Sequence, residues 1–122
     1  MATTSVHYSP AQNVTVKAQT DIEGGSFVEI ADTLDGRNPV VKPATAGATV
    51  FGVVARDVKK NGYVMAYRAG HIVDVQATGS IAAGALVAAA KDGKATTAAD
   101  SAQVAGVAVS AVVGGVVAVA LK

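Results

Sequence analysis

Polar and hydrophobic residues alternate with a period of two along several short stretches of this chain, which is typical of β-strands with one buried face. In Asn13–Gln19 the apolar positions 14, 16 and 18 alternate with polar ones. In Tyr63–Arg68 the side chains of Tyr63, Met65 and Tyr67 share one face. Three further runs contain only apolar residues and glycine, a pattern that predicts strands covered on both faces. These runs are Val50–Ala55, Val104–Val109 and Val116–Leu121.

The pattern also occurs twice. The stretch Ile72–Val87 resembles Asn13–Val28 at a constant separation of 59 positions. The matching pairs are Val14/Val73, Val16/Val75, Ala18/Ala77, Ile22/Ile81, Gly25/Gly84 and Val28/Val87. The likeness resumes at a separation of 54 positions and ends at 53. These later pairs are Val50/Val104, Gly52/Gly106, Val53/Val107, Gly62/Gly115 and Val64/Val117. The second copy therefore lacks five or six residues in its middle.

We therefore expect residues 13–122 to form a single β domain from two internal repeats, residues 13–67 and 72–121, after an N-terminal arm at residues 1–12. About ten short strands at close spacing predict an all-β fold, a small barrel or sandwich. It would be built from two pseudo-symmetric copies of a strand-turn unit, with the arm extended. Neither half is expected to be stable alone, because few strands leave one apolar face uncovered.

Glycine, proline and asparagine mark the turns between the predicted strands. Asp21–Gly25 and Gly79–Gly84 are equivalent turns, and Lys91–Lys94 is a two-residue hairpin signal. Asp35–Pro39 predicts a loop, which leaves Val40-Val41 as a short strand.

The secondary structure of two stretches is harder to predict from the residue pattern. Ala85–Ala90 is rich in alanine, which favours helix, but its repeat partner Ser26–Ala31 favours a strand. Ala98–Gln103 is expected to form one helical turn, capped by Asp100 or Ser101.

Composition and charge limit the core and the partners. Hydrophobic residues make up 51% of the chain and aromatic residues 4%, so small aliphatic side chains must fill the core. There are no cysteines, which excludes disulfides and thiolate metal sites. The net charge of +1 gives no strongly basic surface, so we expect no nucleic-acid partner.

The uncharged stretch Val104–Leu121 is long enough to nominate a membrane span. It contains Gly114-Gly115, which weakens a helix, and its repeat partner Val50–Tyr67 carries charges at the equivalent turn. No aromatic belt or cluster of basic residues flanks it. We therefore expect two strands here and no membrane partner.

The chain has few groups that suit catalysis or metal binding. Neither His7, in the arm, nor His71, between the copies, has a partner visible in the sequence, and His71 is interpreted as a solvated turn residue. A zinc site lacks ligands at workable spacing. The residues Asp32, Asp35 and Asp57 do not have the spacing of a calcium loop. The sequence therefore predicts no enzyme, no cofactor and no metal site.

Several motifs of the second copy form a recognisable series. An ATG turn and apolar strand at Ala77–Val87 is followed by Asp92-Gly93, a VAGVA strand at Val104–Ala108 and a glycine-valine strand at Gly115–Val119. This series resembles the small head-decoration, or capsid cement, proteins of tailed bacteriophages. The resemblance covers most of the second copy and, through the repeat, much of the first.

The resemblance implies a non-catalytic virion protein, made in the host cytoplasm, that binds the outer surface of an assembled phage head and stabilises it. Its partner would be the major capsid protein, and it would be a homotrimer. Some cement proteins reach capsid subunits with an N-terminal arm. By position alone, this implies capsid contacts at Thr3, Thr4, Val6, Tyr8 and Pro10.

A second function class stays open from the sequence. Lipoyl and biotinyl carrier domains are also small duplicated β units, and they present a modified lysine at a hairpin tip. The candidate tips here are Lys60 and Lys91, although neither has the usual flanking residues. The alternative is therefore a non-catalytic ligand-binding or carrier β-module, lipoyl-like or carbohydrate-binding.

Overall fold

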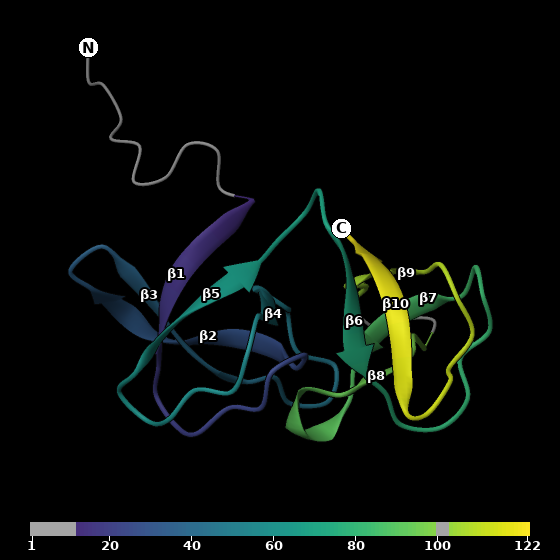
Figure 1. The fold of residues 1–122 in the computed structure, drawn as a ribbon, viewed down its shortest axis with the longest axis horizontal. Coiled ribbons are helices and arrows are strands. Elements are labelled where there is room, and N and C mark those ends of the chain that lie inside the picture. Colours follow the sequence, from purple (N-terminus) through teal and green to yellow (C-terminus); the bar gives the residue numbers. More distant parts are fainter. Residues whose placement is uncertain (1–11, 100–102) are drawn as a thin grey trace, which may run out of the picture.

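The computed structural model describes residues 12–99 and 103–122, and these residues form ten β-strands in two five-stranded sheets (Figure 1). The first sheet consists of β1 (Asn13–Ala18), β2 (Phe27–Asp35), β3 (Asn38–Pro43), β4 (Gly52–Val54) and β5 (Tyr63–Tyr67). The second consists of β6 (Ile72–Gln76), β7 (Leu86–Ala89), β8 (Ala95–Thr97), β9 (Gly106–Ala108) and β10 (Val116–Leu121). A short 3-10 turn, η1 (Lys91–Gly93), joins β7 to β8. The all-β fold class predicted from the sequence is confirmed.

The two sheets have the same strand order. The first closes into a barrel in the order β1-β3-β2-β4-β5, with β5 antiparallel to β1. The second has the order β6-β10-β9-β7-β8. If β6 is matched with β1, β7 with β2, and so on to β10 with β5, each strand has the same neighbours as its counterpart in the first sheet. A parallel bridge between Ala77 and Ala95 joins the two ends of the second sheet. The equivalent contact in the first sheet is the parallel pair of Ala18 and Val41. The second sheet is therefore a nearly closed counterpart of the first.

The residue registers also correspond. Val16 faces Val64 in the first sheet, and Val75 faces Val117 in the second. Between the paired residues Ile30 and Val41 the chain has ten residues, whereas between Ala89 and Ala95 it has five. Most of the length difference between the two halves therefore lies in the β2–β3 hairpin.

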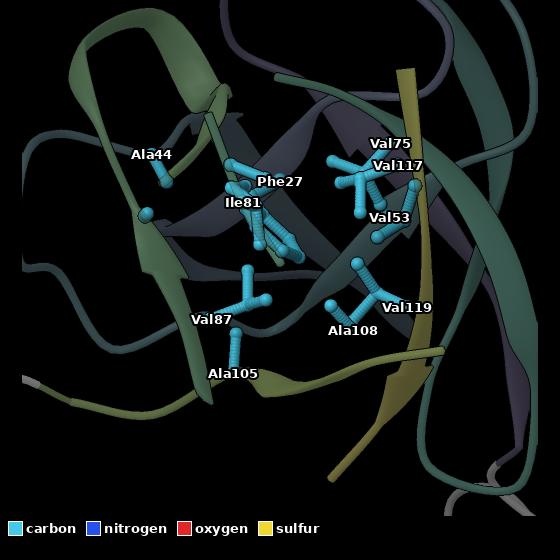
Figure 2. Close-up of a cluster of buried hydrophobic side chains, with 12 residues drawn as sticks. Phe27, Ala44, Val53, Val75, Ile81, Val87, Ala105, Ala108, Val117 and Val119 are labelled. Atoms are coloured by element: carbon cyan, nitrogen blue, oxygen red, sulfur yellow. The ribbon is translucent and has the colours of Figure 1, made fainter. Parts of the chain in front are cut away.

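The first barrel is filled by residues of its own half alone, whereas the core of the second sheet is shared between the two halves. Ten buried residues fill the first: Val14, Val16, Ala18, Ile22, Val28, Val41, Val54, Val58, Val64 and Ala66. The cluster inside the second sheet also includes Phe27, Ala44 and Val53 from the first half of the chain (Figure 2). Phe27 is fully buried there. The first half therefore completes the core of the second.

Backbone hydrogen bonds reinforce this junction. The Gln76 amide donates to the Gly25 carbonyl at 2.9 Å, and the Gly93 amide donates to the Ala44 carbonyl at 2.8 Å. Gly93 has a φ of +75°, and a Cβ there would collide with the Phe27 carbonyl. The turn after β7 thus needs glycine for its backbone angle and for its contact with the other half.

Burial follows the predicted alternation in most strands. In β5, Val64 and Ala66 are buried while Tyr63 is exposed, and Ala85–Ala90 contains the strand β7 rather than a helix. The chain reverses at Asp92-Gly93, where both residues have positive φ, as a two-residue hairpin requires. The structure places this reversal in η1.

Three sequence expectations need correction. Asp35–Pro39 is not a loop, because Asp35 ends β2 and Asn38-Pro39 begin β3, with only two residues turning between them. The strand expected at Val50–Ala55 is limited to Gly52–Val54, and the one expected at Val104–Val109 to Gly106–Ala108. Asp100 and Ser101, the expected helix caps, lie outside the described residues.

The apolar stretch near the C-terminus contains strands. Val104–Leu121 includes β9 and β10. Among residues 12–99 and 103–122, no helix has the length and apolar character needed to cross a membrane.

Candidate interaction surfaces

The histidines and acidic residues considered for chemistry do not form a site in the part of the chain that is described. His71 is half-buried rather than solvated, its Nδ1 lies 3.1 Å from the Arg68 carbonyl oxygen, and its ring lies 4.9 Å from that of Tyr67. His7 lies outside the described residues. Within residues 12–99 and 103–122, no three metal-binding side chains come together. Asp35 and Asp57 instead accept hydrogen bonds from Lys17 and from the Gly24 amide.

The lysines of the carrier alternative lie at exposed turns, as the sequence predicts. Lys60 stands between β4 and β5, where its backbone amide donates to the Asp21 carboxylate at 2.8 Å. Lys91 begins η1. These positions place both lysines in solvent but identify no ligand or modifying partner.

The β2–β3 hairpin is the first candidate interaction surface. It projects from the end of the molecule that lies far from the second sheet (Figure 1). An ion pair of 2.7 Å from Lys17 Nζ to Asp35 Oδ2 holds it against β1, and Asn38 Nδ2 donates to the Thr15 carbonyl at 3.1 Å. The hydrogen bond and charge of Asp35 raise the pKa of Lys17. The hairpin is therefore an ordered projection.

Two large apolar side chains of this hairpin face solvent. Ile30 is 51% exposed and Leu34 is 44% exposed. Leu34 lies in the part of the hairpin that the second half lacks. Because the second sheet forms with a shorter connection, the extension is available for contacts with a partner.

A shallow hollow adjoins the base of this hairpin. It is lined by Glu29, Ile30, Ala48, Thr49, Val50, Phe51 and Arg68. Glu29 Oε2 accepts hydrogen bonds from the Thr45 amide at 2.9 Å and from the Thr45 hydroxyl at 3.0 Å. These bonds, above all the one from the amide, and the charge of Lys42 lower the pKa of Glu29. The Arg68 guanidinium stacks on the Phe51 ring at 4.3 Å. The hollow thus presents an apolar floor between fixed charges.

The outer face of the second sheet is the second candidate surface. Leu86, Val107, Ala120 and Ile72 pair in register across β7, β9, β10 and β6, and together they form what we call the outer row. Leu86 is 55% exposed and Ile72 is 66% exposed. Large apolar side chains that are exposed in one row are typical of a contact surface.

The equivalent row of the first sheet is buried at one end only, because Tyr67 is half-buried and Asn13 is exposed. It consists of Phe27, Val53, Tyr67 and Asn13, which pair in register across β2, β4, β5 and β1. Phe27 is 0% exposed and Val53 is 2% exposed, because the second half of the chain covers them. The position of Phe27 in the repeat is therefore covered in the first copy, whereas the equivalent Leu86 is open in the second.

The predicted capsid contacts in the N-terminal arm are not placed by the structure. Thr3, Thr4, Val6, Tyr8 and Pro10 all lie outside the described residues. The described chain begins at Gln12, whose carbonyl accepts a hydrogen bond of 2.7 Å from the Arg68 amide.

Comparison with known proteins identifies the family. A family model described as phage cement protein matches residues 6–122. The chain belongs to the phage cement protein family. This cement protein is therefore a capsid-associated structural decoration protein and a component of the virion. The resemblance seen in the sequence motifs is confirmed.

A solved structure supports the fold of this cement protein. The N base of the head fiber protein gp8.5 of bacteriophage phi29 superposes with a TM-score of 0.74 and 21% sequence identity. The match covers 90% of this chain and 92% of that chain. No curated protein matches the sequence significantly.

Sequence reasoning missed the two surfaces, although signals for both were present. Val116–Leu121 has apolar residues on both faces, which indicates a strand that is buried on both sides. The core of the second sheet covers only one of these faces. The difference in separation between the repeat pairs indicates an extra segment in the first copy, which is the β2–β3 extension.

Proposed function

We propose that this cement protein binds the outer surface of the assembled phage head as a homotrimer, contacts the major capsid protein and stabilises the shell without catalysing a reaction. The family match over residues 6–122 carries the proposal. A protein that binds the assembled shell better than its separate parts stabilises the shell by mass action. Many copies on a symmetric lattice add their weak contacts through multivalency.

Two elements are proposed to contact the shell. The N-terminal arm would do so through Thr3, Thr4, Val6, Tyr8 and Pro10, and the β2–β3 hairpin through Leu34 and the hollow beside it. The hairpin suits this role because the ion pair between Lys17 and Asp35 and the pairing of β2 with β3 hold Leu34 in place before binding. Order before binding reduces the entropy lost in the complex.

We also propose that residues 13–122 act as one rigid domain. Phe27, Ala44 and Val53 from the first half are part of the second half's core, and hydrogen bonds at Gly25 and Ala44 fix the junction. A single rigid body transmits a contact made at the hairpin to the rest of the protein, and it needs no deep pocket.

Co-sedimentation with expanded shells that lack the protein tests the proposal. The full chain is expected to pellet with the shells and to raise the temperature at which they open. A chain without residues 1–11 and a Leu34→Glu variant are each expected to bind at least ~10-fold more weakly, because each loses desolvated contacts. Lys94→Glu, an exchange in the other half, serves as the surface control. A full chain that stays in the supernatant would contradict the proposal.

A further inference from the structure

Most of the outward-facing positions of the second sheet are apolar. Alternate residues of β10 point away from the core: Val116, Ala118 and Ala120. The neighbouring positions on β9 and β7 are Val107 and Leu86. The polar side chains of this face are Asp74 and Gln76 on β6 and Thr96 on β8, which pairs with Ala88. An antiparallel sheet with one wet face normally alternates apolar with polar residues. This sheet does not, so its outer face has the composition of a covered surface.

The internal repeat indicates what kind of surface covers such a row. In the first sheet, the row through Phe27 and Val53 is covered by the second half of the same chain, which is a copy of the same strand unit. Leu86 and Val107 occupy the equivalent register positions in the second sheet. One chain contains only two copies of the unit, so a third copy must come from another chain.

We propose, building on the homotrimeric cement function above, that the outer row Leu86–Val107–Ala120–Ile72 is the contact between copies of this chain. In a cyclic trimer, three such rows surround the symmetry axis and exclude water from one another. The small residue Ala120 lies between larger ones, so a large side chain of one copy can pack over the alanine of the next.

Charge and size favour a second copy over the capsid surface as the occupant. The outward face carries one charged side chain, Asp74, whereas interfaces between separately folded proteins are more polar than those of homo-oligomers. Four strands spaced ~4.8 Å apart give a row about 15 Å wide. Three such patches meeting at the threefold axis supply the apolar centre of an interface, and a stable interface buries about 800 Å² per partner.

The groove beside the row is continuous with it and extends the contact. It lies between the two halves and is lined by Tyr67, His71, Ile72 and Asp74, among others. Ile72 therefore belongs both to the row and to the junction within the chain. A neighbouring copy that covers Ile72 would also close this groove.

Sedimentation equilibrium of the full chain without shells tests the inference. The wild type is expected to have three times the mass of the single chain, which is 12.0 kDa. Leu86→Glu and Ile72→Glu are expected to weaken self-association at least ~100-fold, because each places an unpaired charge in an apolar contact. Both positions are more than half exposed in the single chain, so the variants are expected to fold. Leu34→Glu, an equally drastic change on the other sheet, should keep the wild-type mass.

Because the chain has no cysteine, single cysteines provide a second measurement in solution and on shells. Leu86→Cys and Ile72→Cys are expected to cross-link between copies with a short bifunctional maleimide, and Leu34→Cys is not. Absence of cross-links at both row positions, on and off the shell, would overturn the inference. An oligomer that persists in both glutamate variants would also overturn it. A third contrary result would be a monomer in which a thiol-reactive dye labels the row cysteines only after residues 1–11 are removed. An oligomer that fails to bind shells would refute the cement function while leaving the subunit contact intact.

Discussion

At the scale of single residues, both halves require a glycine at the same position of the repeat for steric reasons. Gly52 in β4 and Gly106 in β9 occupy equivalent positions and face Val28 and Val87 in register. A Cβ on either glycine would collide with the carbonyl of the strand beside it, at Tyr67 or at Ala120. Neither has a positive φ, so glycine is needed here for the close approach of two backbones.

Gly106→Ala is therefore expected to destabilise the protein by at least ~2 kcal/mol, the upper part of the range for overpacking in a core. The obstacle is backbone, which cannot move aside as a flexible side chain can. Urea unfolding followed by circular dichroism measures the change. The control is Gly36→Ala at the hairpin tip, where nothing lies within 4 Å and only the φ of +65° is strained, at a cost of about 1 kcal/mol. Equal losses for the two variants would argue against the steric explanation.

Glu29 gives a prediction for pH. Its pKa is lowered from 4.5 in the folded chain, chiefly by the Thr45 amide, so the folded state favours the charged form more than the unfolded state does. Its contribution is therefore present above pH ~4.5 and is lost as the pH falls through the lower folded value. Glu29→Gln is expected to cost about 1–2 kcal/mol at pH 7, and the difference should shrink as the pH falls through the lowered folded pKa.

Urea midpoints measured from pH 7 to pH 2 in wild type and variant test this expectation. Thr45→Val removes the hydroxyl donor and keeps the amide, so its effect at pH 7 should be smaller than that of Glu29→Gln. A constant difference between wild type and Glu29→Gln across this range would refute the assigned role of the charge.

At the scale of elements, sequence patterns located strands better than their ends. Val14, Val16 and Ala18 show their alternation plainly, and their strand is β1 as expected. The outer part of the β2–β3 hairpin was missed because acidic residues and proline are depleted in strands, and this part contains both. Register shifts between Ile30, Asp32 and Asp35 accommodate them, and a one-dimensional pattern does not reveal such irregularities.

The hairpin extension is expected to be dispensable for folding. Replacing Ala31–Pro39 with the sequence Ala90–Gly93 gives the first half a connection like the one that joins β7 to β8 and leaves the buried Val40 in place. The lost ion pair of Lys17 is at the surface, where such pairs contribute little, and shortening the loop by half changes closure entropy by about 0.6 kcal/mol. The urea midpoint should therefore change little, while retention on shells should fall as for Leu34→Glu. A chimera that unfolds, or one that binds shells normally, would contradict this division of roles.

At the scale of the whole molecule, the repeat predicted related halves but not how they meet. Phe27 and Leu86 are equivalent apolar residues in equivalent strands, and nothing in their local sequence indicates that one is buried and the other exposed. The difference arises because the two halves join asymmetrically, with Phe27 inside the second core. The candidate surfaces depend on that asymmetry, so they required the three-dimensional arrangement. The family, in contrast, was visible in turn and strand motifs.

Phe27 also gives the sharpest test that both halves form one cooperative unit. Phe27→Ala leaves a cavity in the second core while the residue itself belongs to β2, and such truncations cost about 3–5 kcal/mol. Ile30→Ala in the same strand, at an exposed position, is the control and should cost less than ~1 kcal/mol. Tyr63 and Tyr67 report on the first sheet by fluorescence, and far-ultraviolet circular dichroism reports on both. If residues 13–122 are one domain, the two signals will change at the same, lowered urea concentration in Phe27→Ala. A circular dichroism transition that precedes the tyrosine transition would show that the second sheet unfolds separately, and the single-domain proposal would then be wrong.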